Sequence, residues 1–249
     1  MKLAVKPKQM KLLLAEAGAL GYLLRTTLYA SGIDEKGLLI SGHWAEIGVW
    51  ILTVTVAFAL LLWRRSFAAP ANYEDTSSWL RAAGAALAAV AFAVSPSAQF
   101  PNPVFATIEP VLRITAAGAL ALVATCHFLK KRPTFLLHCV VCLYLALRLI
   151  CQYQLWSVEP QIQHYAFHLG AYVSLLITVY QLASFDADWG SLRNLWTAGL
   201  STVYLSTVSL AHNEESFFLI CCTLWVFSNL VSSTPKGHPD NIFTQEDPL

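Results

Sequence analysis

Long apolar runs separated by short polar segments make up most of this chain. A helix that crosses a bilayer needs about 20 mostly apolar residues. Eight runs approach that length, at residues 12–30, 47–63, 82–95, 110–129, 135–155, 165–185, 195–211 and 216–232. The pattern predicts an all-α fold, a polytopic membrane helix bundle of about eight transmembrane helices.

The basic residues between these runs predict the orientation, because cytoplasmic loops are enriched in Lys and Arg. With the N-terminus inside, only Lys36 falls in an outer loop, and three arginines fall within runs. Twelve basic residues fall in inner segments: Lys2, Lys6, Lys8, Lys11, Arg64, Arg65, Arg81, Lys130, Lys131, Arg132, Arg193 and Lys236. We therefore expect an even number of spans with both termini cytoplasmic.

Composition agrees with a membrane protein. Hydrophobic residues make up 56% of the 249 residues, charged residues only 12%, and the mean hydropathy is +0.54. A soluble domain of this length could hardly bury so much apolar surface. We expect one transmembrane domain over residues 1–232 and a flexible cytoplasmic tail over 233–249. Glu16 and Arg25 interrupt the first apolar run, so we interpret it as an uncleaved helix rather than a signal peptide.

Weaker patterns concern helix packing. Leu24-Arg25 and Leu147-Arg148 occupy comparable depths in the first and fifth runs, which would fit a four-plus-four repeat. Small and hydroxyl residues recur at helical spacing in four runs, where they favour close interhelical contact: Ala17 with Gly21, Gly84 with Ala88, Ala117 with Ala121 beside Gly118, and Thr202 with Ser206, Ser209 and Asn213.

Three arginines within the runs carry most of the functional information. Each costs on the order of 2.5–3.5 kcal/mol at a helix centre, so an intramembrane Arg normally faces the bundle or water and has a partner. Arg25, Arg113 and Arg148 all fall in the outer half of the predicted bundle. Other polar groups share that level: His43, Glu46, Glu109, Gln152, His164, His168, His212, Glu214 and Glu215. The chain therefore predicts an extracytoplasmic polar layer.

Spacing shows which groups share a helix face. Glu109 and Arg113 are four residues apart and can pair on one helix. Tyr144, Arg148 and Gln152 form one stripe, and Tyr22, Arg25 and Tyr29 form a comparable one. Arg25 and Arg148 have no acidic partner nearby in the sequence.

Three interpretations of these arginines stay open. They are structural if they reach the outer headgroups or pair with Glu46, Glu159 or Glu215. They bind a ligand if Arg25 and Arg148 line an outward cavity, where the planar guanidinium suits a carboxylate or phosphate. A catalytic role is the third.

Histidines at the outer level raise the question of a metal. His164 and His168 are four residues apart, and His43 and Glu46 are three apart, a spacing that can ligate zinc with His212 as a further candidate. No complete ligand signature is present, so we favour interfacial histidines and leave the metal question open.

The cysteines form a second candidate cluster on the inner side. Cys126-His127 and His138-Cys139 with Cys142 have residue types that could bind a soft metal. Buried cysteine is also simply a small apolar side chain, and all six cysteines fall within predicted helices. We expect neither a disulfide framework nor a cofactor here.

Residues 156–165, Trp-Ser-Val-Glu-Pro-Gln-Ile-Gln-His-Tyr, with Arg148 upstream, resemble a stretch found in uncharacterised bacterial multi-pass membrane proteins. The resemblance covers mainly the fifth to seventh runs. It implies a bacterial inner-membrane protein and supplies no activity or substrate.

Together these features favour binding or transport of a small, possibly anionic, solute through an outer polar cavity. The candidate binding residues are Arg25, Arg148, Gln152, Arg113, Glu109, His164 and His168. The alternatives are a non-catalytic subunit of a membrane complex and an intramembrane metal-dependent enzyme. No phosphate-binding glycine loop, nucleophile elbow or nucleic-acid-binding surface is evident, and we expect the lipid bilayer as the main partner.

Overall fold

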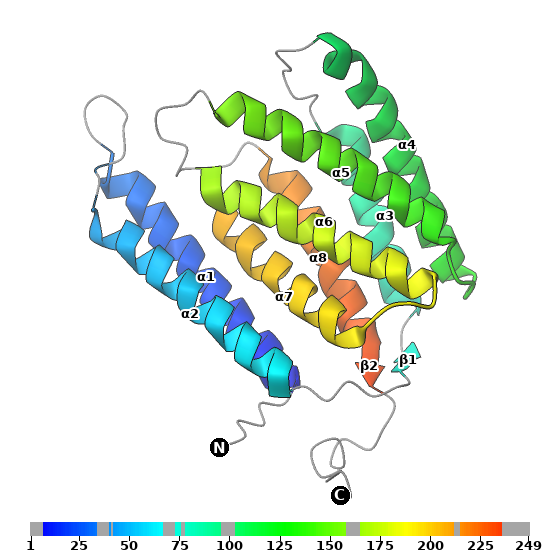
Figure 1. The fold of residues 1–249 in the computed structure, drawn as a ribbon, viewed down its shortest axis with the longest axis horizontal. Helices are drawn as coiled ribbons and strands as arrows, with labels where there is room; N and C mark the ends of the chain where they lie inside the picture. The colour runs from blue at the N-terminus through cyan, green and yellow to red at the C-terminus, as the bar shows by residue number, and fades with distance from the viewer. Residues whose placement is uncertain are drawn as a thin grey trace, which may run out of the picture.

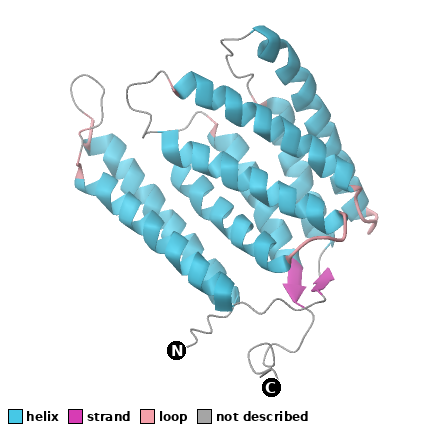
Figure 2. Ribbon diagram, in the orientation of Figure 1, coloured by secondary structure: helices cyan, strands magenta, loops and turns pink. Residues whose placement is uncertain are grey.

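The structure, a computed structural model of the full chain, describes residues 7–33, 40, 42–66, 73–75, 78–95, 103–157, 165–211 and 215–235. Its described part consists of eight helices and one very short two-stranded ribbon (Figures 1 and 2). The helices are α1 (Pro7–Ser31), α2 (Trp44–Ser66), α3 (Ser78–Val94), α4 (Pro103–Phe128), α5 (Phe135–Trp156), α6 (Ala166–Asp186), α7 (Leu192–Ser209) and α8 (Ser216–Ser232). The prediction of an all-α fold is confirmed.

Most helices match the predicted runs closely, but α4 begins earlier than expected. Its sequence was expected to become helical at Pro110, whereas the helix starts at Pro103 and includes Pro110. Proline at the first position of a helix costs little, because the N–H it lacks has no partner there. An internal proline is tolerated in apolar helices when neighbouring groups satisfy the freed carbonyls.

The ribbon lies at one end of the helical assembly (Figure 1). Strand β1 (Tyr73–Asp75) pairs antiparallel with β2 (Ser233–Pro235), with Glu74 opposite Thr234. The ribbon therefore ties the segment before α3 to the residues that follow α8. It includes the first three residues of the predicted tail, and the rest of that tail, 236–249, lies outside the described residues.

Six of the helices form a closed ring. Each helix from α3 to α8 packs on the next, and α8 returns to pack on α3. Helix α1 packs on α7 from outside the ring, and α2 lies chiefly on α1 (Figure 1). In a four-plus-four repeat, α2 would correspond to α6 and α3 to α7. Helix α6 runs along α7, whereas α2 makes its main contacts with α1 and α7. The two halves of the chain therefore pack differently.

Small residues permit the closest contacts between helices. A Cβ on Gly84 of α3 would lie 2.2 Å from Ser228 Oγ of α8, and one on Gly21 of α1 would lie 2.6 Å from a methyl of Val208 in α7. Around Gly118 of α4, by contrast, nothing lies within 4 Å of the added atom. Two of the three predicted small-residue surfaces therefore lie at helix contacts through these glycines.

The hydroxyl stripe of α7 also meets a neighbouring helix. Thr202 Oγ1 lies 2.8 Å from Thr178 Oγ1 of α6, and Ser206 and Ser209 are buried. Asn213 lies outside the described residues. The described part of the stripe thus supports interhelical packing.

Among the described residues, four helices are long and apolar enough to cross a membrane. The candidate spans are Trp44–Arg65, Val104–Phe128, Phe135–Leu155 and Ala166–Asp186. Helices α3 and α8 are apolar but have only 17 residues each, which is near the lower limit for a span. The structure therefore agrees with association with a membrane.

Candidate functional site

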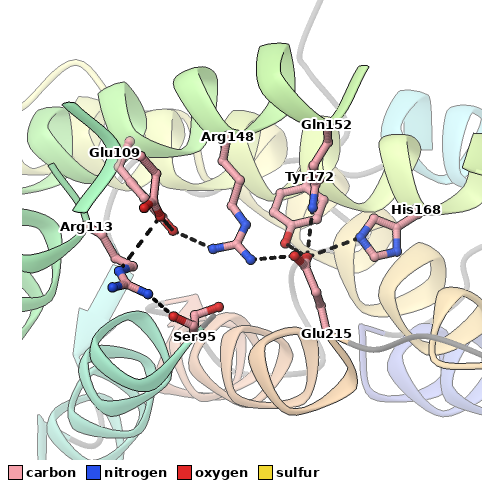
Figure 3. Close-up of polar contacts among 9 residues, drawn as sticks. Ser95, Glu109, Arg113, Arg148, Gln152, His168, Tyr172 and Glu215 are labelled. Atoms are coloured by element: carbon pink, nitrogen blue, oxygen red, sulfur yellow. Dashed lines mark hydrogen bonds and ion pairs between the residues drawn. The ribbon is translucent and has the colours of Figure 1, made fainter. Parts of the chain in front are cut away.

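A chain of polar contacts crosses the ring near the start of α8, whereas the ribbon follows the end of α8. Figure 3 draws these contacts. It begins at the residue after α3, passes through α4, α5 and α6, and ends at the residue before α8. Its members are Ser95, Glu109, Arg113, Tyr144, Arg148, Gln152, His168, Tyr172 and Glu215. Helices that are distant in sequence are therefore joined through charged groups.

Glu215 is the centre of this chain of contacts. Arg148 Nη2 donates to its Oε1 at 2.6 Å. Gln152 Nε2 donates to Oε2 at 2.8 Å, and the Tyr172 hydroxyl donates to the same oxygen. His168 Nε2 lies 3.4 Å from Oε2. Both oxygens of one carboxylate are thus engaged by side chains of α5 and α6.

Helical spacing explains why these groups converge. Arg148 and Gln152 are four residues apart in α5 and therefore project from one face, as do His168 and Tyr172 in α6. Because α5 packs directly on α6, the two faces meet in front of the first turn of α8. The donors are held by rigid helices rather than by loops.

Arg148 is enclosed almost completely. Its side chain is 1% exposed, and its Nη1 donates to the Tyr144 hydroxyl one turn earlier in α5. The guanidinium carbon lies 4.8 Å from the ring centre of Phe218 and 5.9 Å from that of Tyr172. A buried cation needs such charge compensation and ring contact, since desolvation otherwise costs several kcal/mol.

The surroundings of Glu215 keep its carboxylate ionised at neutral pH. Burial opposes ionisation, but hydrogen bonding to His168, the Arg148 charge and the Tyr172 hydroxyl together hold the pKa of Glu215 well below its ordinary value. The site therefore holds a carboxylate anion and a guanidinium cation side by side.

A second acid continues the chain of contacts toward α4. Glu109 is buried, and the Tyr144 hydroxyl donates to its Oε1 at 3.4 Å. Arg113 Nε lies 3.8 Å from the same oxygen, and Arg113 Nη1 donates to the backbone carbonyl of Ser95. The expected spacing of Glu109 and Arg113 therefore brings them close, although Arg113 also holds the end of α3.

Arg25 lies in a different environment, on α1. It is 5% exposed, and its Nη2 donates to the Tyr29 hydroxyl at 2.7 Å. Its guanidinium carbon lies 5.1 Å from the ring centre of Phe167, the residue before His168 in α6. Arg25 and Arg148 thus lie in different surroundings. Arg25 contacts the ring of Phe167 in α6, whereas Arg148 of α5 pairs with the Glu215 carboxylate.

The metal candidates are only partly described. His164 and His212 lie outside the described residues. His43 Nδ1 accepts a hydrogen bond from the backbone N–H of Ala45 at the start of α2. Within the described ranges, no group of three His, Cys, Asp or Glu side chains is placed to hold a metal ion. The interpretation of the outer histidines as interfacial residues rather than metal ligands stays a prediction.

Near the start of α5 lies a pair that sequence reasoning missed. His138 Nδ1 of α5 lies 2.6 Å from Asp186 Oδ2 at the end of α6, and the His138 ring is stacked on Trp225 of α8. The sequence placed His138 beside Cys139 and Cys142, residue types that could bind a soft metal, although no cofactor is expected there. No spacing rule links His138 to Asp186, so only helix packing reveals the pair.

The site around Glu215 also contains members that the sequence did not single out. Tyr172 could have been found, because it lies four residues after His168 on the same helix face. The Ser95 carbonyl carried no signal, since a backbone acceptor is available at every helix end. Glu215 was one of three acids considered as partners for the arginines.

Comparison with known proteins adds no relative. The chain matches no protein-family profile, no curated protein and no solved structure. Its function is therefore inferred from the site itself.

Proposed function

We propose that this chain is a bacterial inner-membrane protein with eight spans and cytoplasmic termini that binds or transports a small anionic solute at its outer end. The observation that carries the proposal is the fully enclosed Arg148 beside the Glu215 carboxylate. Ionisable side chains within a membrane are expensive and usually mark a functional pathway.

The outward surface of the helices supports the membrane assignment. Large apolar side chains on α2, such as Trp50, Val54 and Phe58, are exposed. Soluble monomers rarely expose contiguous apolar surface of this kind, whereas lipid tails cover it without cost. The charge bias of the loops supports cytoplasmic termini, and with that orientation Arg148 and Glu215 would lie in the outer half. A four-plus-four repeat stays a hypothesis that the different packing of the two halves does not favour.

Cysteine accessibility tests the orientation. Single cysteines introduced in place of Glu35, Gln99 or Glu214 should react with an impermeant thiol reagent added to intact cells. Cysteines at Tyr73 or Lys131 should react only after the membrane is opened. The background is the chain with its six native cysteines replaced by alanine or serine. Reversal at two or more positions would exclude the eight-span arrangement.

The anionic solute is supported by the chemistry of the guanidinium group. A planar Arg fork matches the two oxygens of a carboxylate or phosphate and remains charged at all physiological pH values. Helices α5 and α6 add amide, phenol and imidazole groups beside Arg148, as a selective site requires. The site is therefore equipped to orient a small anion as well as to attract it.

Thermal denaturation of the purified protein in detergent tests solute binding. A solute present at about 100 times its Kd stabilises the folded state by about 2.7 kcal/mol. Titration with acetate, lactate, succinate and phosphate at constant ionic strength should raise the midpoint for at least one anion. Sodium chloride and a neutral amide such as acetamide serve as controls. No response to any small anion would contradict the proposal.

A further inference from the structure

Glu215 occupies a position from which a side chain normally stabilises its own helix. It is the N-cap residue of α8, where an acidic side chain usually accepts a hydrogen bond from the first free N–H groups. Its carboxylate makes no such bond. It crosses instead to α5 and α6, where Arg148 and Gln152 hold its two oxygens.

The contacts divide into two independent parts. The donors Arg148, Gln152 and Tyr172 belong to α5 and α6, as does His168. The Glu215 carboxylate, which accepts from these donors, belongs to the turn before α8. The Glu215 side chain makes no cap hydrogen bond, and its backbone carbonyl accepts a hydrogen bond from the N–H of Leu219 in α8. Withdrawal of the Glu215 side chain would therefore break no backbone hydrogen bond of that helix.

We propose that α5 and α6 form a receptor for a carboxylate group, and that Glu215 is its internal occupant, which a small monocarboxylate solute displaces. This inference rests on the proposed function and names its substrate class. The four donors would hold the solute carboxylate as they hold Glu215, with one oxygen on Arg148 and the other on Gln152, Tyr172 and His168.

Charge balance favours a monoanion over a dianion. The Arg148 charge is matched by one negative charge on Glu215, and Glu109 next to Arg113 adds a second near-neutral pair. A phosphate dianion in place of the Glu215 carboxylate would leave one uncompensated negative charge beside the buried Glu109. Excess charge in a low-dielectric site is costly, so the site selects carboxylates of single charge.

Replacement of Glu215 by a smaller residue gives the direct test. Glu215→Ala removes the occupant and leaves all four donors in place, so the variant should melt at a lower temperature than the wild-type protein. Formate or acetate should restore the midpoint by several degrees, and chloride at equal ionic strength should not. The matched control is Asp188→Ala, which removes an exposed carboxylate that also lies 2.6 Å from an arginine. Its midpoint should not respond to acetate.

Glu215→Gln covers the case in which the alanine variant does not fold. The amide keeps the size of the side chain but lacks its charge, so it competes less well for Arg148. Equilibrium binding of radiolabelled acetate to Glu215→Gln should be at least tenfold tighter than to the wild-type protein. Adding Arg148→Gln to this variant should abolish the binding.

The outcomes separate the receptor from the proposed function. Failure of acetate to act on either Glu215 variant, or equal rescue by phosphate, would overturn the carboxylate receptor even if the wild-type protein responds to another anion. If acetate rescues the Glu215 variants but no anion stabilises the wild-type protein, the result supports a carboxylate receptor on α5 and α6. The same result would refute displacement of Glu215 by a solute, and the solute-binding function with it.

Discussion

Burial should decide what an ion pair of given geometry contributes to stability, and this chain contains a matched comparison. Arg148 and Glu215 lie 2.6 Å apart with side chains 1% and 15% exposed. Arg132 and Asp188 also lie 2.6 Å apart, but their side chains are 69% and 71% exposed. Water screens the second pair and not the first, so removal of one partner should have very different effects.

The structure sets the expected magnitudes. Removal of one partner from a buried pair costs about 3–5 kcal/mol, because the other charge stays buried. Arg148→Met leaves the Glu215 carboxylate with Gln152, Tyr172 and His168 as neighbours, so we expect the lower end, about 3 kcal/mol. Arg132→Met should cost about 0.2–1 kcal/mol, as exposed pairs do.

Double-mutant cycles give the assay. The free energy of unfolding is measured in mixed micelles of dodecylmaltoside and sodium dodecyl sulfate for single and double variants. The cycle of Arg148→Met with Glu215→Gln should give a coupling energy of about 1.5–3 kcal/mol. The cycle of Arg132→Met with Asp188→Asn should give less than about 0.5 kcal/mol. Equal coupling in the two cycles would refute the reasoning that burial controls the contribution.

Three further predictions concern packing and charge. Gly84→Ala should lower the free energy of unfolding by about 1–3 kcal/mol through overpacking, because its Cβ would lie 2.2 Å from a side-chain oxygen. Gly118→Ala adds its Cβ in open space and should not destabilise the protein. Equal losses of unfolding free energy in the two variants would contradict this prediction. Because the pKa of Glu215 in the folded protein is lower than its ordinary value of 4.5, the Glu215 carboxylate stabilises the fold at pH values above 4.5. This stabilisation is lost as the pH falls toward the folded-state pKa. The melting midpoint should therefore fall more steeply on acidification from about pH 5 in the wild-type protein than in Glu215→Gln; parallel curves would argue against it. Asp186→Asn should cost about 1–3 kcal/mol in the same unfolding assay, because His138 loses a charged acceptor, and an unchanged value would show that their contact contributes nothing.

Sequence alone determined the features that depend on local composition. Apolar runs predict helices wherever they occur, since an apolar segment must satisfy its own backbone hydrogen bonds, and the described part of the chain has eight helices near the predicted positions. Fixed spacing within one helix likewise brought Glu109 near Arg113, and placed Arg148 and Gln152 on one face. The early start of α4 escaped prediction, because Pro103 and Pro110 are both compatible with a helix start.

Tertiary structure decided which distant groups meet. Three acids were candidate partners for the arginines, and only the closing of the helix ring, with α8 packed on α3 and α7, places Glu215 on Arg148. The pairing of His138 with Asp186 was decided in the same way, by contact between α5 and α6. Apolar helices offer many equivalent packing faces, so sequence periodicity cannot select among them. Mutual contact of whole helices makes that selection, and it turned isolated charged residues into one connected site.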